Sequence, residues 1–142
     1  MTNPIPDGYH TVTPYLIVKG VADLIEFIKE VFDGEEIRIT PRLDGSIQHA
    51  RVRVGDSPIM MGEPVGDMTP MPATLYVYVD DPDAAYERAL KAGATSVRAP
   101  ADQFYGDRNA GVQDASGNQW WMAAHKEDVS PEELAKRLSD QA

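Results

Sequence analysis

The sequence predicts an α+β fold in which a β-α-β-β-β order of elements occurs twice. Short runs rich in β-branched and aromatic residues predict strands, and two segments with apolar residues at helical spacing predict helices. The second set of elements repeats the first at an offset of 61 residues, as these pairs show: Thr13 and Thr74, Tyr15 and Tyr76, Val18 and Val79. Two copies predict one pseudo-symmetric domain over residues 1–142 rather than a solenoid.

The first module extends over about residues 9–63. Residues 13–18 predict a buried strand, and residues 20–34 predict an amphipathic helix that ends at Gly34. Strands are expected at 35–40 and 46–55, joined by an Asp44-Gly45 turn, and again at 57–63. Residues 64–72 are rich in Pro and Gly, which predicts a linker.

The second module extends over about residues 73–125. A strand at 74–79 precedes a helix that begins at Asp81, with Pro82 in its first turn, and closes at Gly93. Further strands are expected at 95–100, 109–115 and 118–124. A C-terminal helix over about 130–139, with Ser130 and Glu133 as a capping box, is expected to dock on the surface.

The composition limits the possible partners and chemistry. A net charge of −10 predicts repulsion from nucleic acid and from anionic membrane surfaces, so neither is an expected partner. The chain has no cysteine, which excludes thiol nucleophiles and thiolate metal sites. It shows no signal-peptide pattern and no apolar run of about 20 residues, so a cytoplasmic location is expected.

Strand periodicity predicts which side chains point away from the helices. Alternate residues of a strand lie on opposite faces of the sheet, and one face must pack under the helix. The other face then mixes aromatic, hydroxyl, imidazole and guanidinium groups, which suits a small-molecule cavity. The alternative is a set of half-exposed strand positions beside a dimer interface. The residues on this face are Thr13, Tyr15, Ile17, His49, Arg51, Arg53, Met60, Thr74, Tyr76, Tyr78 and Trp121.

Four motifs occur in order along nearly the whole chain: GYHTVTPYLIV, QHARVRVGDSPIMM, ADQFYGDRNAGVQDASGNQWWMAAH and EDVSPEEL. With these motifs the sequence resembles the vicinal oxygen chelate superfamily of glyoxalase I, bleomycin-resistance proteins and extradiol dioxygenases. It is most similar to the PhnB-like branch. The resemblance implies paired βαβββ modules that form a cup-shaped mixed sheet in a homodimer.

The resemblance also implies where a metal would be held. Metal-dependent relatives place one His, Gln or Glu at each of four inward positions, which here are Thr13, Met60, Thr74 and Trp121. These side chains are poor ligands for a divalent metal, so no cofactor is expected. The glyoxalase and extradiol-dioxygenase mechanisms, which depend on a metal, are therefore not expected either. A displaced metal site stays open as an alternative, with these candidate ligands: His10, His49, His125, Glu63 and Asp107.

The FYGDR motif has two interpretations. Arg108 could bind an anionic ligand, with Tyr105 stacking at the mouth of a cavity. Alternatively, Asp107 and Arg108 could fasten this loop to the next strand, with Gly106 forming the turn and Asp102 capping the loop.

Three functions are therefore considered. The first is a metal-free protein that binds a small aromatic or amphipathic molecule through residues drawn from this set: Tyr15, His49, Arg51, Met60, Tyr76, Tyr78, Tyr105, Arg108 and Trp121. The second is a lyase or isomerase-type enzyme with His49 as general base and arginines that stabilise an enolate or carboxylate. The third is a structural or regulatory dimer.

Overall fold

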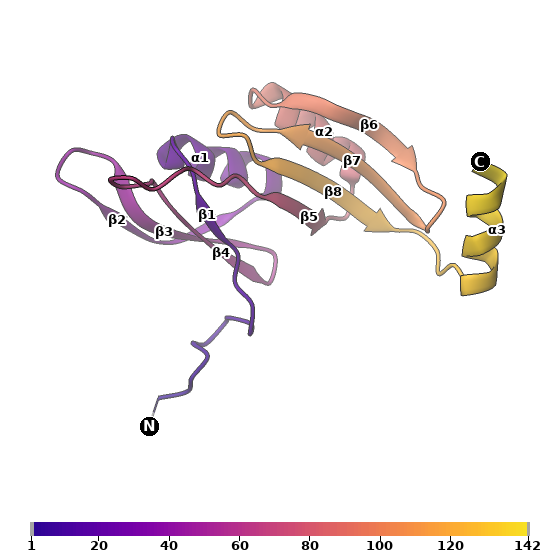
Figure 1. The fold of residues 1–142 in the computed structure, drawn as a ribbon, viewed down its shortest axis with the longest axis horizontal. Coiled ribbons are helices and arrows are strands. Elements are labelled where there is room, and N and C mark those ends of the chain that lie inside the picture. Colours follow the sequence, from indigo (N-terminus) through magenta and orange to yellow (C-terminus); the bar gives the residue numbers. More distant parts are fainter. Residues whose placement is uncertain (1, 142) are drawn as a thin grey trace. The chain divides into compact units, whose positions relative to one another are not determined.

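The computed structural model describes residues 2–141, which form two compact units. The first unit comprises residues 2–73 with 114–118, and the second comprises residues 74–113 with 119–141. Each unit contains a four-stranded mixed sheet with one helix packed against it (Figure 1). The predicted α+β class is confirmed.

The first unit contains β1 (Tyr15–Ile17), α1 (Val21–Phe32), β2 (Glu35–Pro41), β3 (Ile47–Val54) and β4 (Ser57–Gly62). The strand order is β1-β4-β3-β2, with β1 parallel to β4 and the other pairs antiparallel. Helix α1 ends at Phe32, two residues earlier than predicted, and Asp33 rather than Gly34 adopts the left-handed conformation, with φ 54°. Gly34 is needed for packing instead: a β-carbon there would lie 2.7 Å from the Ile28 side chain.

The second unit contains β5 (Thr74–Tyr78), α2 (Pro82–Lys91), β6 (Thr95–Asp102), β7 (Asp107–Gln113), β8 (Gln119–His125) and α3 (Pro131–Gln141). Its strand order is β5-β8-β7-β6, with β5 parallel to β8. As predicted, Asp81 caps α2: its carboxylate accepts a 3.1 Å hydrogen bond from the Ala84 N–H, and Pro82 occupies the first turn.

The register of the parallel strands repeats between the units. Tyr15 lies opposite Met60 in the first sheet, and Tyr76 lies opposite Trp121 in the second. Both pairs are related by the offset of 61 residues found in the sequence. The repeat therefore extends to the hydrogen-bonded pairing of the strands, and the β-α-β-β-β order occurs twice as predicted.

The core of each unit lies between its sheet and its helix. In the first unit Leu16, Val18 and Val52 are buried on the helix side, and in the second Trp120 is fully buried. Because neighbours in a strand alternate, Tyr15 and Trp121 fall on the opposite face, with partial exposure. The helix-facing side is thus the hydrophobic core, which leaves the other face available for polar and aromatic groups.

Helix α3 lies beyond the end of β8 and contributes no buried residue (Figure 1). The Ser130 hydroxyl accepts a 3.1 Å hydrogen bond from the Glu133 N–H, which is one half of the predicted capping box. The Glu133 carboxylate accepts from Arg137 at 3.1 Å, and Arg137 also donates to the Phe104 carbonyl at 2.9 Å. Polar contacts therefore hold this helix in place. No helix among residues 2–141 has the length and apolar composition to cross a bilayer.

Candidate functional site

The open face of the first sheet brings together four of the residues predicted to bind a ligand. Tyr15, His49, Arg51 and Met60 come from β1, β3 and β4, and Met60 is the strand neighbour of both Tyr15 and Arg51. Tyr15 remains 48% exposed although it lies in a sheet. An aromatic ring, an imidazole, a guanidinium and a thioether therefore share one accessible surface.

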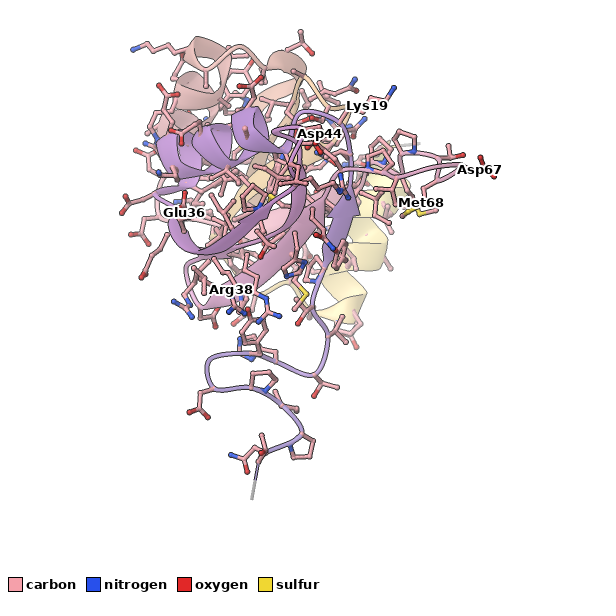
Figure 2. The ribbon with its side chains drawn as sticks, turned by 90° about the vertical axis from the view of Figure 1, so that its left-hand side faces the viewer. Lys19, Glu36, Arg38, Asp44, Asp67 and Met68 are labelled. Atoms are coloured by element: carbon pink, nitrogen blue, oxygen red, sulfur yellow. The ribbon has the colours of Figure 1, made fainter. Side chains whose placement is uncertain are left out.

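A hollow of about 570 Å³ opens on this face. Its walls combine apolar side chains from β1 and from the segment after β4 with polar groups from β3. The lining residues are Tyr15, Ile17, Arg42, Gln48, His49, Gly62, Glu63, Val65 and Met68. The segment predicted as a linker thus supplies part of the wall, and Figure 2 shows Met68 at the edge of the first unit.

Two charged residues of the hollow have structural partners. The Glu63 carboxylate accepts hydrogen bonds from the backbone N–H groups of Gly20 at 3.0 Å and Ile47 at 2.6 Å. Arg42 donates to the Ser46 hydroxyl at 3.2 Å and to the Glu63 carbonyl at 3.0 Å. These two side chains shape the rim of the hollow.

His49 lies between Tyr15 and Arg51. Its Nδ1 is 3.1 Å from the Tyr15 hydroxyl, and its Nε2 accepts a 3.0 Å hydrogen bond from Nε of Arg51. Burial lowers the pKa of His49, and the positive charges of Arg51 and Arg38 lower it further. His49 is therefore neutral at physiological pH.

The N-terminal segment packs against the arginine row of β3. Arg51 donates to the Tyr9 hydroxyl at 3.3 Å, and its guanidinium lies 5.5 Å from the centre of the Tyr9 ring. His10 bonds through Nε2 to the Asp56 carbonyl at 3.1 Å. The segment before β1 thereby covers one side of Arg51, and the motif GYH has a structural explanation.

The open face of the second sheet carries a hydrogen-bonded tyrosine cluster. The Tyr76 hydroxyl donates to Asp107 at 2.7 Å, and the Asn109 amide donates to the hydroxyls of Tyr76 at 3.1 Å and Tyr105 at 2.7 Å. The Tyr78 ring meets Tyr76 edge-on at 5.4 Å. Burial raises the pKa of Tyr76, and the neighbouring Asp107 raises it further. Tyr76 therefore stays protonated, and the hydroxyls of Tyr76 and Tyr105 are already bonded within the unit.

His125 lies between two carboxylates at the end of β8. Its Nδ1 is 2.8 Å from Asp107 and its Nε2 is 2.7 Å from Asp128. These hydrogen bonds raise the pKa of His125. Burial opposes ionisation of Asp107, but the hydrogen bonds from His125 and Tyr76 outweigh it and lower the Asp107 pKa. An ion pair therefore fastens the end of β8 to β7.

Arg108 is held by two carboxylates. Its Nε and Nη2 donate to the two oxygens of Asp83, each at 2.8 Å, and its Nη1 donates to Asp102 at 3.2 Å. Hydrogen bonds to Asp83 and then Asp102 raise the Arg108 pKa. These contacts link β7 to α2 and to β6. They favour the structural interpretation of the FYGDR motif over anion binding by Arg108.

Trp121 packs onto its own sheet. A β-carbon on Gly111, its neighbour in β7, would lie 2.9 Å from the indole ring. The guanidinium of Arg98 lies 5.3 Å from the ring centre, and the indole N–H points to Gln119 at 3.4 Å. The ring is thus held between the backbone and a cation.

The comparison with known proteins decides the family. The model of the Glyoxalase/Bleomycin resistance protein/Dioxygenase superfamily matches residues 9–122. The chain belongs to this superfamily. The resemblance inferred from the four motifs is therefore confirmed, and the paired βαβββ units are those of a glyoxalase-type protein.

This superfamily member is also similar to an uncharacterised protein in sequence and to solved structures in fold. An uncharacterised protein of Mycobacterium bovis is 34% identical over 141 residues, which cover 92% of this chain and 93% of that protein. TioX from Micromonospora sp. ML1 has a TM-score of 0.69 at 22% identity, covering 82% of this chain and 98% of TioX. A PhnB protein from Bacillus cereus has a TM-score of 0.65 at 15% identity, covering 81% of this chain and 99% of that protein. Its name describes it as a putative 3-demethylubiquinone-9 3-methyltransferase. At such identities the two structures show a shared fold.

The donor set of this superfamily member does not fit a glyoxalase-type metal. The four corresponding positions hold Thr13, Met60, Thr74 and Trp121, and none offers an imidazole or carboxylate. Within residues 2–141, no group of three His, Cys, Asp or Glu side chains is arranged to hold a metal ion. The candidates for a displaced site meet only in pairs: His125 contacts Asp107 at 2.8 Å, and His49 and Glu63 line the same hollow, whereas His10 contacts the Asp56 carbonyl.

Several residues of the first open face were missed by sequence reasoning. Val65 and Met68 lie in a Pro/Gly-rich segment without periodicity, so no pattern assigned them to a wall. Arg38 is the cross-strand neighbour of Arg51, but a register shift between Glu36 and Arg38 interrupts the alternation of β2. A cross-strand alignment of positive charges was the one signal that could have identified Arg38.

Proposed function

We propose that this chain binds a small aromatic or amphipathic molecule on the open face of its first sheet, in the manner of a bleomycin-resistance protein and without chemistry at a metal. The observation that carries this proposal is the hollow of about 570 Å³ beside Tyr15 and His49. Apolar walls with a few placed polar groups are typical of small-molecule sites.

The apolar part of the hollow supplies the binding energy. Val65 is 48% exposed and Met68 is 46% exposed, so both lose contact with water when a ligand covers them. Covering roughly 200 Å² of apolar surface at about 25 cal/mol/Å² contributes about 5 kcal/mol before the cost of ordering the ligand. A free energy of about 5 kcal/mol would correspond to a dissociation constant of about 0.2 mM, and the cost of ordering makes the expected affinity of a simple apolar probe weaker than this.

The first face supports this proposal better than the second. The hydroxyls of Tyr76 and Tyr105 and the carboxylate of Asp107 bond to one another or to Asn109. A ligand would have to compete with these bonds. The Tyr15 hydroxyl borders the hollow instead.

The enzyme hypothesis is weaker at this site. A general base must offer a lone pair to its substrate. The lone pair on Nε2 of His49 accepts from Arg51, so it is occupied.

The homodimer and the cytoplasmic location stay predictions. Sedimentation equilibrium tests whether the protein is a homodimer.

The test is a titration of the ¹⁵N-labelled full-length chain with 2-naphthylmethanol, an uncharged aromatic probe. We expect saturable changes in the amide resonances of Ile17, Gln48, Gly62 and Met68, because these residues line the hollow. The substitution Met68→Glu should weaken binding about tenfold or more, because it places a charge in the apolar wall.

Leu138→Glu is the matched control, since Leu138 is 49% exposed in α3 and lies outside the hollow. It should leave the affinity unchanged. Resonances that stay constant up to millimolar probe, or that move without preference for the hollow, would overturn the proposed function.

A further inference from the structure

The hydrogen bonds around His49 have a defined direction. The guanidinium of Arg51 can only donate, so Nε2 of His49 must carry a lone pair. A neutral imidazole holds its single proton on the other nitrogen, which is Nδ1. The lowered pKa of His49 agrees with this neutral form.

The direction continues from His49 to Tyr15. The Nδ1–H donates to the Tyr15 oxygen over 3.1 Å, so that oxygen is an acceptor in this bond. The hydroxyl proton of Tyr15 is then free to donate to a group in the hollow that Tyr15 lines. Arg51, His49 and Tyr15 thus form a chain that presents a donor to the ligand.

A second cation, Arg38, lies next to Arg51 of this hydrogen-bonded series. Arg38 and Arg51 are cross-strand neighbours, an arrangement that is destabilising for like charges unless an anion is present. The acidic residues of β2 pair elsewhere, Glu36 with Lys29 and Glu35 with Arg53. In the described part of the chain, no carboxylate forms an ion pair with Arg38 or Arg51. Arg38 is exposed, and Figure 2 shows it at the side of the first unit away from Lys19.

We infer that the ligand of the first face carries a carboxylate, which Arg38 and Arg51 bind while Tyr15 donates a hydrogen bond. This inference rests on the proposed function and names its ligand class: a small molecule with an apolar body and an anionic oxygen group. His49 is a positioning residue that orients the Tyr15 hydroxyl.

The dimensions of the strand agree with such a ligand. His49, at the hollow, and Arg51 are two positions apart along β3. At the usual rise of about 3.3 Å per residue, this is a distance of about 7 Å. A bicyclic ring with one carboxylate spans this distance. Because the whole chain has a net charge of −10, general electrostatic attraction does not favour an anion, and any gain must come from this local cluster.

The experiment compares 2-naphthoate with 2-naphthylmethanol, which has the same ring and no charge. Dissociation constants are measured by the NMR titration described above for the full-length chain and its variants. We expect 2-naphthoate to bind roughly tenfold tighter or better, since charge-assisted hydrogen bonds are about twice as strong as neutral ones. Arg38→Gln should remove most of that preference, because the affinity for 2-naphthoate falls toward that for 2-naphthylmethanol.

Lys19→Gln is the matched control, because it removes the same charge at a distant exposed site of the same unit. It should keep the preference for 2-naphthoate. His49→Gln can still accept from Arg51 and donate to Tyr15, so it should retain the preference, whereas His49→Leu should reduce it.

The two proposals fail in different ways. If 2-naphthylmethanol binds in the hollow and 2-naphthoate binds no tighter, the carboxylate inference is wrong and the proposed function stands. An equal loss in Lys19→Gln and Arg38→Gln would also overturn the inference, since it would indicate a general charge effect. If neither probe binds, the proposed function itself is wrong.

Discussion

The indole ring of Trp121 lies directly over Gly111, its neighbour across the β7–β8 ladder. A β-carbon at position 111 would come within 2.9 Å of three ring atoms, closer than real side chains pack. The two residues form one packing unit on the open face of the second sheet. Several properties of the protein can be tested from contacts of this kind.

Gly111→Ala should destabilise the fold by about 1–3 kcal/mol, because the added methyl group must displace Trp121. Urea denaturation of the wild type and the variant measures the change in unfolding free energy. The double variant Gly111→Ala/Trp121→Ala separates the cause: in the Trp121→Ala background, the added methyl should cost much less. Equal costs in both backgrounds would show that the ring is not responsible.

The His125–Asp107 ion pair should make stability depend on pH. The folded-state pKa of His125 is raised above its ordinary value near 6.5, so its contribution is fully present below pH 6.5 and is lost as pH rises through the raised value. The pKa of Asp107 is lowered, so its contribution is present above its ordinary value near 3.8 and is lost as pH falls through the lowered value.

Unfolding free energies measured between pH 5 and 9 test this dependence. The wild type should lose more stability toward pH 9 than His125→Gln does. His10→Gln is the control, because it removes a histidine that contacts Asp56 rather than Asp107. If His125→Gln follows the wild type over the whole range, His125 does not carry the predicted charge.

Asn118→Ala should destabilise the fold by about 1–3 kcal/mol, since it removes the partners of buried polar groups. Asn118 is fully buried; its Oδ1 accepts from the Ala73 N–H at 3.0 Å and its Nδ2 donates to Asp114 at 3.0 Å. Thermal and urea unfolding measure the loss. Asn3→Ala, at an exposed position, should change stability little. A similar loss in both variants would contradict the role of this buried network.

Metal removal should leave the protein unchanged. The positions that hold metal in glyoxalase-type relatives lack nitrogen and carboxylate donors here, so neither EDTA nor added Ni²⁺ or Zn²⁺ should shift the unfolding temperature. Untagged protein analysed by plasma mass spectrometry should contain well below one metal ion per chain. A stoichiometric metal that EDTA removes with loss of stability would contradict this prediction.

The sequence by itself determined the fold class and the order of the elements. Helical and strand periodicities come from local geometry, and the offset of 61 residues identified Tyr15 and Tyr76, and Met60 and Trp121, as corresponding positions. The register of both sheets confirmed this correspondence. Four motifs were enough to indicate the superfamily, which the family model confirmed.

Only the tertiary structure decided which polar groups are free and which are already bonded. The sequence left two interpretations of Arg108 open, because its partner Asp83 lies in another element 25 residues away. It also missed Arg38, which a register shift in β2 places beside Arg51. The hydrogen-bond direction around His49 depends on how closely side chains of two strands, β1 and β3, approach one another. Sequence patterns specify only the face of a strand on which a side chain lies.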